Sequence, residues 1–593
     1  MSNVNKTQFN KISCLLLAER NAKGFWDGEL SSSALSTAVS ITALKINDCS
    51  EDDLKIELGI KWLLNNINSD GGFGDTAESI SNISTSLLCY AAISYCGNDY
   101  SESESYLQKI KKYLSTEKIE LASGSISDSI LAFYGKDYTF SVPILTMLTI
   151  CEVIDKDSFN RIPQLPFEFS VFPTKFYQFF NLQVVSYAIP ALIAVGIAIF
   201  KNRSKGNWLI KKIRQRTINP SLKKLEKLVP LSGGFLEAIP LTAFVNLCLN
   251  YAGYSNSKTV IKGIEFLHNQ QRKDGSWPID TNLSTWVTTL AIKAFGNTVN
   301  AEFSKIEIDG LRNHLLKNQC KEVHAFNNAK SGGWGWTNYS GSVPDADDTS
   351  GAILALINLY EGTEVENQAL IHGVNWLLSV QNRDGGIPTF SKGWGKLPFD
   401  ASCADITGHG FLALIKSLNL LQNKLPKSLN KKWERATQRM ANYLLKNQNK
   451  DGSWIALWFG NQNTPSKNNK VYGTAKVSTY LKDAMEISNS NQKLQEAINK
   501  AQLFLTHQQN SDGSFGAEKG ITGTIEETAL AVSALAKSEH KTCITMALAW
   551  LENEIKINGL HSSPIGLYFA TLWYDEKLYP YTFYLETLRK NIS

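Results

Sequence analysis

The sequence has no paired-cysteine motif and no opening segment of the kind that directs secretion. Its 9 cysteines are scattered over 593 residues without a Cys-x-x-Cys pair, which is typical of reduced thiols. Residues 1–10 lack the basic stretch followed by an apolar one that a secretory leader would have. These two absences predict a cytoplasmic protein without disulfides.

Charge is also scarce, and runs that alternate polar and apolar residues are nearly missing. Charged residues make up 19% of the chain and apolar residues 43%, which excludes a disordered protein and predicts a large core. The net charge of +5 is small for this length, so no nucleic-acid partner is expected. Without two-residue alternation, the periodicity predicts an all-α fold with two or more domains.

One sequence pattern returns along the chain. A helix ends in Leu-Leu or aromatic-Leu, a Gln or Asn follows, and an Asp-Gly turn then leads in most copies to an aromatic residue. Copies of this turn occupy residues 70–73, 274–277, 384–386, 451–454 and 512–515, with weaker forms at 24–26 and 332–334. Glycine permits the left-handed turn that ends each helix, and another apolar helix follows. Helix pairs repeated in this way predict an α-α barrel or a solenoid.

Three carboxylates stand together in residues 344–349, Pro-Asp-Ala-Asp-Asp-Thr, directly before an apolar helical run. Like charges this close do not all ionise at neutral pH, and Asp347 in the middle is the expected holder of the proton. A helix N-terminus favours anions, so Asp345 and Asp348 are expected to be charged. A neutral carboxylic acid in this setting is a candidate general acid. An acidic helix cap and a divalent-metal loop are the alternatives.

Asp405 and His409 lie four residues apart, and this spacing puts both on one face of a helix. An imidazole near Asp347 would orient that acid and stabilise the carboxylate left after proton loss. Cys403, Asp405 and His409 are also potential zinc ligands. Their spacing matches no standard zinc signature, so neither a metal nor another cofactor is expected.

The same half of the chain is rich in aromatic residues, namely Trp286, Trp334, Trp336, Trp458, Tyr472, Trp573 and Tyr574. In repeat helices such residues usually fill the core. An aromatic face also stabilises a cation by about 0.5–2 kcal/mol, and by more where water is excluded. Rings gathered around one cavity would therefore stabilise a cationic intermediate, and Trp334 and Trp336 come just before the acid cluster.

A different composition interrupts the repeats between residues 184 and 227. Residues 184–200 carry no charge and reach the lower length limit of a membrane span, although Pro190 favours a buried or interfacial helix. Residues 201–227 hold ten Lys or Arg and one acid, Glu226. This basic, amphipathic stretch predicts attachment to an anionic membrane surface, with a solvated helix face as the alternative.

Together these motifs resemble the squalene-hopene cyclase family of class II terpene cyclases. The repeated units are similar to its QW motifs, and residues 345–349 are similar to its Asp-x-Asp-Asp-Thr acid motif. The resemblance implies two α-α barrels, with a catalytic α6-α6 barrel formed by residues 1–28 and 284–593. Residues 29–283 would form the inserted second barrel, with a membrane-facing segment at about 184–228. It also implies monotopic attachment at the cytoplasmic face of a membrane, and a homodimer is left open.

By motif matching, Asp347 resembles the proton donor of the family, with Asp345 and Asp348 beside it. His409 resembles the histidine that hydrogen-bonds the donor, and Tyr472 resembles the tyrosine that helps to reprotonate it through water. The candidate substrate contacts are Trp286, Trp334, Trp336, Trp458, Tyr187, Asp405, Trp573 and Tyr574, of which Tyr187 falls where the family carries Trp.

The chain departs from the family pattern in three places. Ser350 stands where the family has Ala, residues 31–37 lack the glutamate thought to position the terminating water, and residues 565–574 keep aromatic rings but not the family spacing. These departures fall on the cyclisation and quenching end of the cavity, so the product need not be hopene and the substrate need not be squalene.

The expected reaction is protonation of the terminal alkene of a linear polyprenoid, squalene or a related C20–C35 chain, followed by polycyclisation through carbocations. An alkene is favoured over an epoxide, because the Asp-Cys-Thr-Ala-Glu segment of oxidosqualene cyclases is missing. No Asp-Asp-x-x-Asp motif of a diphosphate-ionising synthase stands out. The alternatives are a zinc-dependent prenyltransferase-like toroid and a non-enzymatic α-α repeat protein that binds partners.

Overall fold

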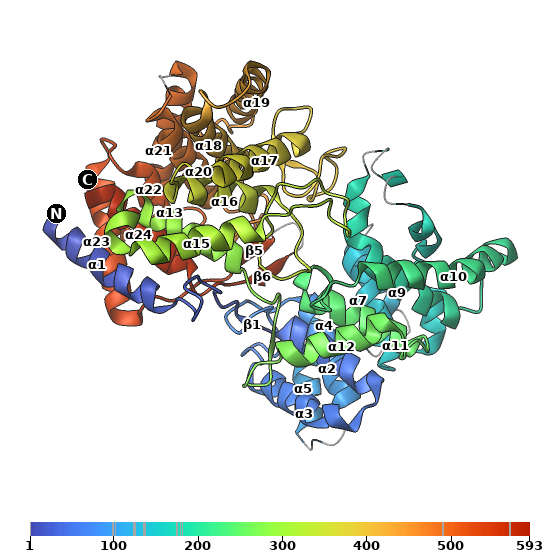
Figure 1. Ribbon diagram of the computed structural model, residues 1–593. Coiled ribbons are helices and arrows are strands. Elements are labelled where there is room, and N and C mark those ends of the chain that lie inside the picture. Colours follow the sequence, from blue (N-terminus) through green and yellow to red (C-terminus); the bar gives the residue numbers. More distant parts are fainter. Residues whose placement is uncertain are drawn as a thin grey trace.

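The computed structural model describes residues 2–97, 100, 102–121, 126–134, 138–173, 176–177, 180, 182–488, 491–567 and 571–592. Nearly all regular structure in these ranges is helical, which confirms the predicted all-α class. Figure 1 shows the helices arranged in two bodies, one made mainly of the yellow-to-red half of the chain and one of the blue-to-green half.

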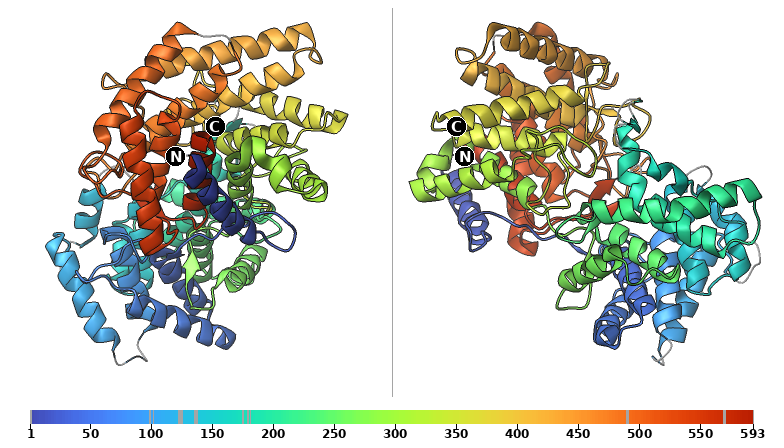
Figure 2. Two further views of the ribbon diagram at one scale, coloured as in Figure 1. Left: turned by 90° about the vertical axis from the view of Figure 1, so that its left-hand side faces the viewer. Right: turned by 45° about the vertical axis from the view of Figure 1, so that its right-hand side comes forward.

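The first body is a closed ring of helix pairs. Its inner helices are α13 (Ser284–Phe295), α16 (Ala346–Asn358), α18 (Ala404–Leu421), α20 (Lys470–Met485), α22 (Ile525–Leu535) and α24 (Tyr579–Ile592). Each inner helix contacts the next, and α24 contacts α13 to close the ring. The outer helices are α1 (Ser2–Ala18), α15 (Lys305–Asn318), α17 (Glu364–Val380), α19 (Lys427–Lys446), α21 (Gln492–Gln508) and α23 (Lys541–Asn558). Helix α1 packs on α24, so both chain ends lie on this body (Figure 2).

The second body is a smaller ring built in the same way. Its inner helices are α2 (Ala34–Asn47), α4 (Ile83–Cys96), α7 (Tyr138–Ile150), α9 (Ile189–Asn202) and α11 (Ile239–Tyr251). Each contacts the next, and α11 contacts α2. Around them lie α3 (Asp53–Asn65), α5 (Ser103–Thr116), α6 (Ile126–Tyr134), α10 (Trp208–Leu228) and α12 (Lys258–Gln270). The two rings are the two α-α barrels that the resemblance implied.

Short elements connect the helices. The antiparallel strand pairs are β1 (Ser32–Ser33) with β2 (Trp277–Pro278), β3 (Ile387–Pro388) with β4 (Ser402–Cys403), and β5 (Ile565–Leu567) with β6 (Leu572–Tyr574). Single helical turns are α14 (Val299–Glu302), η1 (Ser50–Asp52), η2 (Lys156–Asn160), η3 (Phe167–Val171), η4 (Gln183–Ala188), η5 (Phe235–Glu237) and η6 (Gly296–Thr298).

The buried apolar side chains form two cores that follow this division. Residues within 9–26 and 286–588 make the core of the first barrel. Residues within 34–277 make the core of the second, together with Phe326 and Val343 from the connecting segments. The domain limits expected at residues 28 and 283 stay a prediction.

The glutamines of the repeat fasten neighbouring helix pairs to one another. The Gln381 Nε2 group donates to the Gly385 carbonyl of its own turn at 2.8 Å and to the Ala436 carbonyl of the next outer helix at 3.1 Å. Equivalent pairs of bonds are made by Gln271, Gln319, Gln448 and Gln509. Each glutamine thus satisfies one turn carbonyl and one carbonyl of an adjacent outer helix.

The apolar run of the second barrel lies largely inside the protein. Val185–Asn202 is the one stretch in the described part of the chain that is long and apolar enough to cross a membrane, and 61% of it is buried. Helix α9, which makes up most of it, packs against α7 and α11. This packing favours the buried helix over a membrane span.

Replacing Gln381 by Ala tests the helix fastening. The variant leaves two carbonyls without their donor, and an unmade buried hydrogen bond costs about 1–3 kcal/mol. We expect a lower guanidinium midpoint than for Gln495→Ala, which removes an exposed glutamine on α21 that bonds only Asn499. Equal midpoints for the two variants would contradict the fastening role.

Candidate active site

Hydroxyl groups hold the inner helices of the first barrel in one register. On α16, Thr349 Oγ1 accepts the backbone N–H of Trp334, which belongs to the preceding repeat turn, at 3.0 Å. Equivalent bonds join Trp26 to Thr288, Ile387 to Thr407, Trp454 to Thr474 and Phe515 to Thr528.

Two layers of side chains follow from this register. The residues two positions before each hydroxyl are Trp286, Asp347, Asp405, Tyr472 and Glu526, all in the first turn of an inner helix. The residues two positions after it are Leu290, Gly351, His409, Lys476 and Leu530. Four candidates from the sequence therefore share the first layer, and the candidate histidine lies in the second.

The acid cluster begins helix α16. Asp345 caps the helix, because its Oδ1 accepts the backbone N–H groups of Asp347 at 3.0 Å and Asp348 at 2.9 Å. Asp345 and Asp348 are 4% and 5% exposed, whereas the Asp347 side chain keeps 16%. Asp347 is thus the most accessible carboxyl group of the three.

Burial changes the charges expected for the two flanking carboxyls. It raises the pKa of Asp345 to about 7, and hydrogen bonds from Asp348 and its backbone oppose this. Burial, with the neighbouring Asp345 charge, raises the pKa of Asp348 well above its ordinary value. The expectation that Asp348 is charged is therefore wrong, because the N–H groups at this helix start bind Asp345 and the Asp348 carboxyl is desolvated.

His409 contacts the middle carboxyl directly, as the sequence predicted. Its Nδ1 atom lies 2.6 Å from Asp347 Oδ1. The imidazole stacks on Tyr480 with ring centres 4.6 Å apart, and Trp286 meets it edge-on at 6.2 Å. Gly351 lies beside it and allows the close approach of Thr289, since a Cβ atom at residue 351 would lie 2.7 Å from Thr289 Oγ1 but 3.6 Å, an ordinary contact distance, from His409 Cε1.

The three residues considered as zinc ligands do not share one centre. The Cys403 thiol donates to Asp405 Oδ1 at 2.5 Å, whereas His409 faces Asp347. In the described part of the chain, no three His, Cys, Asp or Glu side chains are placed to hold a metal ion. Burial, with the nearby Asp347 charge, raises the pKa of Asp405 to about 6.

Tyr472 lies in the same layer as Asp347 and is fully buried. Its ring stacks on Phe459 at 4.5 Å, and its hydroxyl has no hydrogen-bond partner among the described residues. Burial, followed by the Asp347 charge, raises the pKa of Tyr472 well above its ordinary value, so the hydroxyl is neutral.

Aromatic side chains from both barrels meet in a seam cluster, defined here as Tyr187, Trp336, Phe390, Phe399 and Trp458. Tyr187, from the second barrel, lies 5.0 Å from Phe390 and 5.4 Å from Phe399 between ring centres. Trp458 meets both phenylalanines edge-on at 5.5 Å, and Trp336 meets Phe390 at 6.3 Å. Phe390 and Phe399, which the sequence analysis missed, thus link three predicted substrate contacts, Tyr187, Trp336 and Trp458.

The C-terminal aromatics lie between the acid and the second barrel. The Trp286 indole N–H donates to the Tyr579 hydroxyl at 3.1 Å, and the Tyr579 and Tyr574 hydroxyls are 3.3 Å apart. The backbone N–H of Trp573 donates to Asp75 Oδ2 of the second barrel at 2.8 Å. Trp573 therefore lies at the junction of the barrels, and Tyr574 lies on the acid side.

Trp334 is a packing residue, which corrects its prediction as a substrate contact. Its side chain is fully buried, its indole N–H donates to the Leu315 carbonyl at 2.7 Å, and Gly373 packs against its ring. Trp26, Trp277 and Trp454 make the same indole bond in other repeats. The indole is thus part of the helix-pair framework, away from the inner face of the ring.

Two residues in the layers escaped the sequence analysis. Glu526 occupies the position of Asp347 on the opposite inner helix, and its segment Thr524-Ile-Glu-Glu-Thr528 parallels the acid motif closely enough to have been found. Burial and the Glu527 charge raise the pKa of Glu526 to about 8. On α20, Lys476 occupies the position that His409 has on α18. A lysine within an apolar helical stretch was the sequence signal that could have identified it.

Family models match both halves of the chain. The squalene-hopene cyclase N-terminal domain matches residues 10–205, and the C-terminal domain of the same family matches residues 282–529. The chain belongs to the squalene-hopene cyclase family. This places the protein among the class II terpene cyclases.

Individual members of the family are distant. Enfumafungin synthase from Hormonema carpetanum is 26% identical over 356 residues, which is 54% of this chain and 25% of that protein. A probable squalene–hopene cyclase from Sinorhizobium fredii is 21% identical over 638 residues, or 92% of this chain and 90% of that one. The structure of ent-copalyl diphosphate synthase from Streptomyces platensis aligns with 99% of this chain and 100% of its own, with a TM-score of 0.61 and 14% identity. That likeness supports the two-barrel fold.

Replacing Glu526 by Gln tests whether this squalene-hopene cyclase family member buries a neutral acid there. The unfolded chain loses this proton near pH 4.5 and the folded chain near pH 8, so wild-type stability falls as the pH rises through this interval. Glutamine has no proton to lose, so the Tm of the variant should rise relative to wild type between about pH 5 and 8. Calorimetry on the exposed-site control Glu51→Gln should give a constant difference. A constant difference for Glu526→Gln would contradict the burial of a neutral carboxyl.

Proposed function

We propose that this protein binds a linear polyprenoid and that Asp347 protonates its terminal alkene to start a polycyclisation. The observation that carries the proposal is the 2.6 Å contact between Asp347 Oδ1 and His409 Nδ1 at the start of an inner helix. Asp347 is also the most accessible carboxyl of its cluster. An acid oriented by an imidazole and open on one side is suited to give its proton to a ligand.

In the first step, the alkene π electrons form a C–H bond with the Asp347 proton. The proton leaves as the Asp347 carboxylate forms, and the other alkene carbon becomes a tertiary cation. Successive double bonds then attack the cation and close rings, until the last cation loses a proton or is captured by water. Dry surroundings and fixed dipoles favour such a step, and folding the chain brings its double bonds into contact.

Tyr472 is the proposed relay that restores the proton. Its neutral hydroxyl is buried in the first layer with Asp347, and Phe459 holds its ring. A hydroxyl both donates and accepts, so it can pass a proton from water to the carboxylate without becoming charged.

The seam cluster is the proposed guide for the rest of the substrate. Its five rings come from both barrels and present apolar faces and edges, which hold a hydrocarbon and stabilise cations. The relative from S. fredii is a probable squalene–hopene cyclase, which makes squalene the first substrate to test. Related C20–C35 chains are the next.

The proposed membrane contact is an exposed apolar surface, defined here as Phe169, Phe172, Phe176, Trp208 and Ile213. Trp208 is 71% exposed, and the phenylalanine rings stack on each other 4.8 and 6.2 Å apart. Apolar side chains of this size open to solvent on a monomer mark a binding surface. Exposed basic side chains on the same segment suit an anionic membrane at its cytoplasmic face. The homodimer stays a prediction.

Replacing Asp347 by Asn tests the proton donor. The variant keeps the shape of the side chain but has no carboxyl proton, so cyclisation should fall by at least about 10²-fold. Product from squalene and from C15 to C35 linear polyprenes is followed by mass spectrometry, with Asp53→Asn as an exposed control. An Asp347→Asn variant that folds and cyclises at the wild-type rate would remove Asp347 from the mechanism.

Replacing Lys205, Lys212 and Arg216 by Glu tests the membrane contact. All three are exposed, whereas Arg214 forms a two-point ion pair with Glu168 at 3.0 Å and is therefore left in place. Each basic residue near an anionic surface contributes about 1 kcal/mol, so the triple variant should pellet much less with phosphatidylserine liposomes. Replacing Lys427, Lys431 and Lys432 on the first barrel is the control. Equal loss in both variants would rule out this surface.

A further inference from the structure

Lys476 is a buried cation beside the proposed acid. It lies on α20 in the same layer as His409 and is 3% exposed. Its ammonium has no hydrogen-bond partner among the described residues. An ammonium group taken out of water without an acceptor is strongly destabilising unless its surroundings compensate.

An aromatic cage supplies that compensation. The Nζ atom lies 5.0 Å from the ring centre of Phe583, 5.6 Å from those of Tyr472 and Tyr480, and 5.7 Å from that of Trp286. Ring faces attract a cation, and four of them around one ammonium hold its position without an anion. Burial, with Lys293 nearby, lowers the pKa of Lys476 to about 8, so it stays charged near neutral pH.

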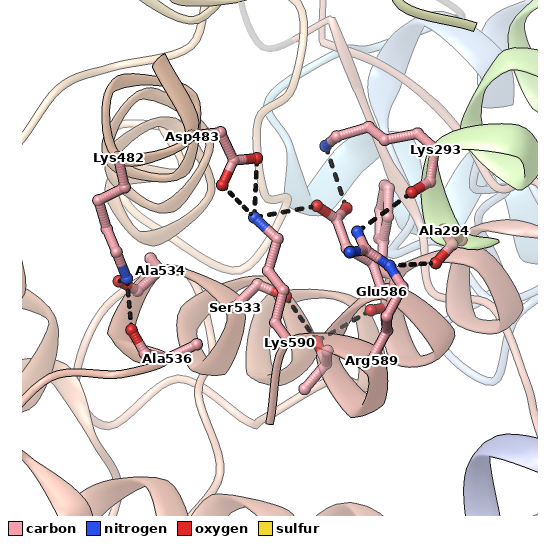
Figure 3. A network of polar contacts seen from close by, with 12 residues as sticks. Lys293, Ala294, Lys482, Asp483, Ser533, Ala534, Ala536, Glu586, Arg589 and Lys590 are labelled. Atoms are coloured by element: carbon pink, nitrogen blue, oxygen red, sulfur yellow. Dashed lines mark hydrogen bonds and ion pairs between the residues drawn. The ribbon is translucent and has the colours of Figure 1, made fainter. Parts of the chain in front are cut away.

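A second lysine stands close by, but its charge is paired. Lys293 Nζ lies 4.8 Å from the Tyr480 ring centre and 3.0 Å from Glu586 Oε2. Figure 3 shows Glu586 between Lys293 and Lys590, which in turn bonds Asp483. Although burial opposes it, these two lysines hold the pKa of Glu586 well below its ordinary range. Lys293 and Lys590 are thus paired with carboxylates, whereas Lys476 has no ion-pair partner among the described residues.

The cage places that charge next to the imidazole. Tyr480 and Trp286 form two sides of the cage, and both contact the His409 ring. A short carboxyl–imidazole contact can hold its proton on Asp347, as a neutral pair, or on His409, as an ion pair. A fixed cation disfavours the imidazolium but favours the carboxylate, so it favours the neutral pair when it lies nearer to the imidazole, and the two rings shared with His409 place Lys476 on that side.

The groups that face His409 act in opposite directions. Burial lowers the pKa of His409, the bond and charge of Asp347 oppose this, and the Lys293 and Lys476 charges lower it further. Asp405, on the same helix, has a raised pKa of about 6 and a bond from Cys403. The Lys293 and Lys476 charges therefore both oppose a proton on the imidazole; Lys293 is paired with Glu586, whereas Lys476 has no ion-pair partner among the described residues.

We propose that Lys476 is a positioning residue for the acid: its caged charge keeps His409 neutral, so that the reacting proton stays on Asp347. The proposal rests on the proposed function for its catalytic consequence. Its effect on His409, in contrast, exists with or without substrate.

The test measures the protonation of His409 directly. Protein labelled with ¹³C-histidine is titrated by NMR, and His409→Asn identifies the resonance. Lys476→Met and Lys476→Leu remove the charge and suit the apolar cage, so the His409 pKa should rise by about one unit or more. Lys476→Arg keeps the charge and should keep the wild-type titration. Lys482→Met, on the same helix but bonded to the Ala534 and Ala536 carbonyls, should leave it unchanged.

Activity gives an independent reading. In Lys476→Met, the rise in imidazolium should lower kcat/KM for polyprene cyclisation about tenfold or more below the new His409 pKa, with rescue by Lys476→Arg. An unchanged His409 titration in both neutral variants would overturn the Lys476 proposal, even if activity fell. If wild type cyclises none of the polyprenes while the titration shifts as expected, the proposed function fails and the electrostatic role of Lys476 stands.

Discussion

One hydrogen bond sets the geometry on which the site depends, namely the bond from a backbone N–H of each repeat turn to a hydroxyl on the next inner helix. It fixes the position of each inner helix along the barrel axis, because the turn and the helix cannot slide past each other while the bond is made. The first-turn residues Asp347, Asp405 and Tyr472 therefore lie in one layer although they are more than fifty residues apart in the sequence. The site is assembled by the repetition itself.

Burial then decides how the chemical groups of the layers differ. Asp345 and Asp347 belong to one motif, yet Asp345 caps the helix, whereas Asp347 contacts His409 and is more accessible. Asp348 is enclosed, and burial raises its pKa well above the ordinary value. The two lysines near the imidazole also differ in their surroundings. Lys293 forms an ion pair with Glu586, whereas Lys476 is surrounded by aromatic rings. Similar side chains thus acquire different charges from their positions.

Periodicity was enough to predict the helical class, whereas the two barrels and the contact of His409 with the acid cluster were implied by the resemblance to the family. The sequence analysis was wrong about Trp334 because a repeat tryptophan and a substrate-facing one look alike until the direction of the indole is known. It was wrong about Asp348 because desolvation depends on neighbours from distant helices. Phe390 and Phe399 were missed for the same reason, since Tyr187 reaches them from the second barrel and Trp458 from a later repeat of the first.

The cage around Lys476 also affects the rings that form it. Trp286 and Tyr472 turn electron-rich faces toward the ammonium, so those faces are already occupied when a carbocation forms nearby. Like charges repel strongly where water is excluded. In the proposed reaction, a carbocation formed beside Asp347 would therefore be repelled by the caged ammonium and attracted toward the rings of the seam cluster. The caged charge would in this way give the cation a preferred direction away from its point of origin.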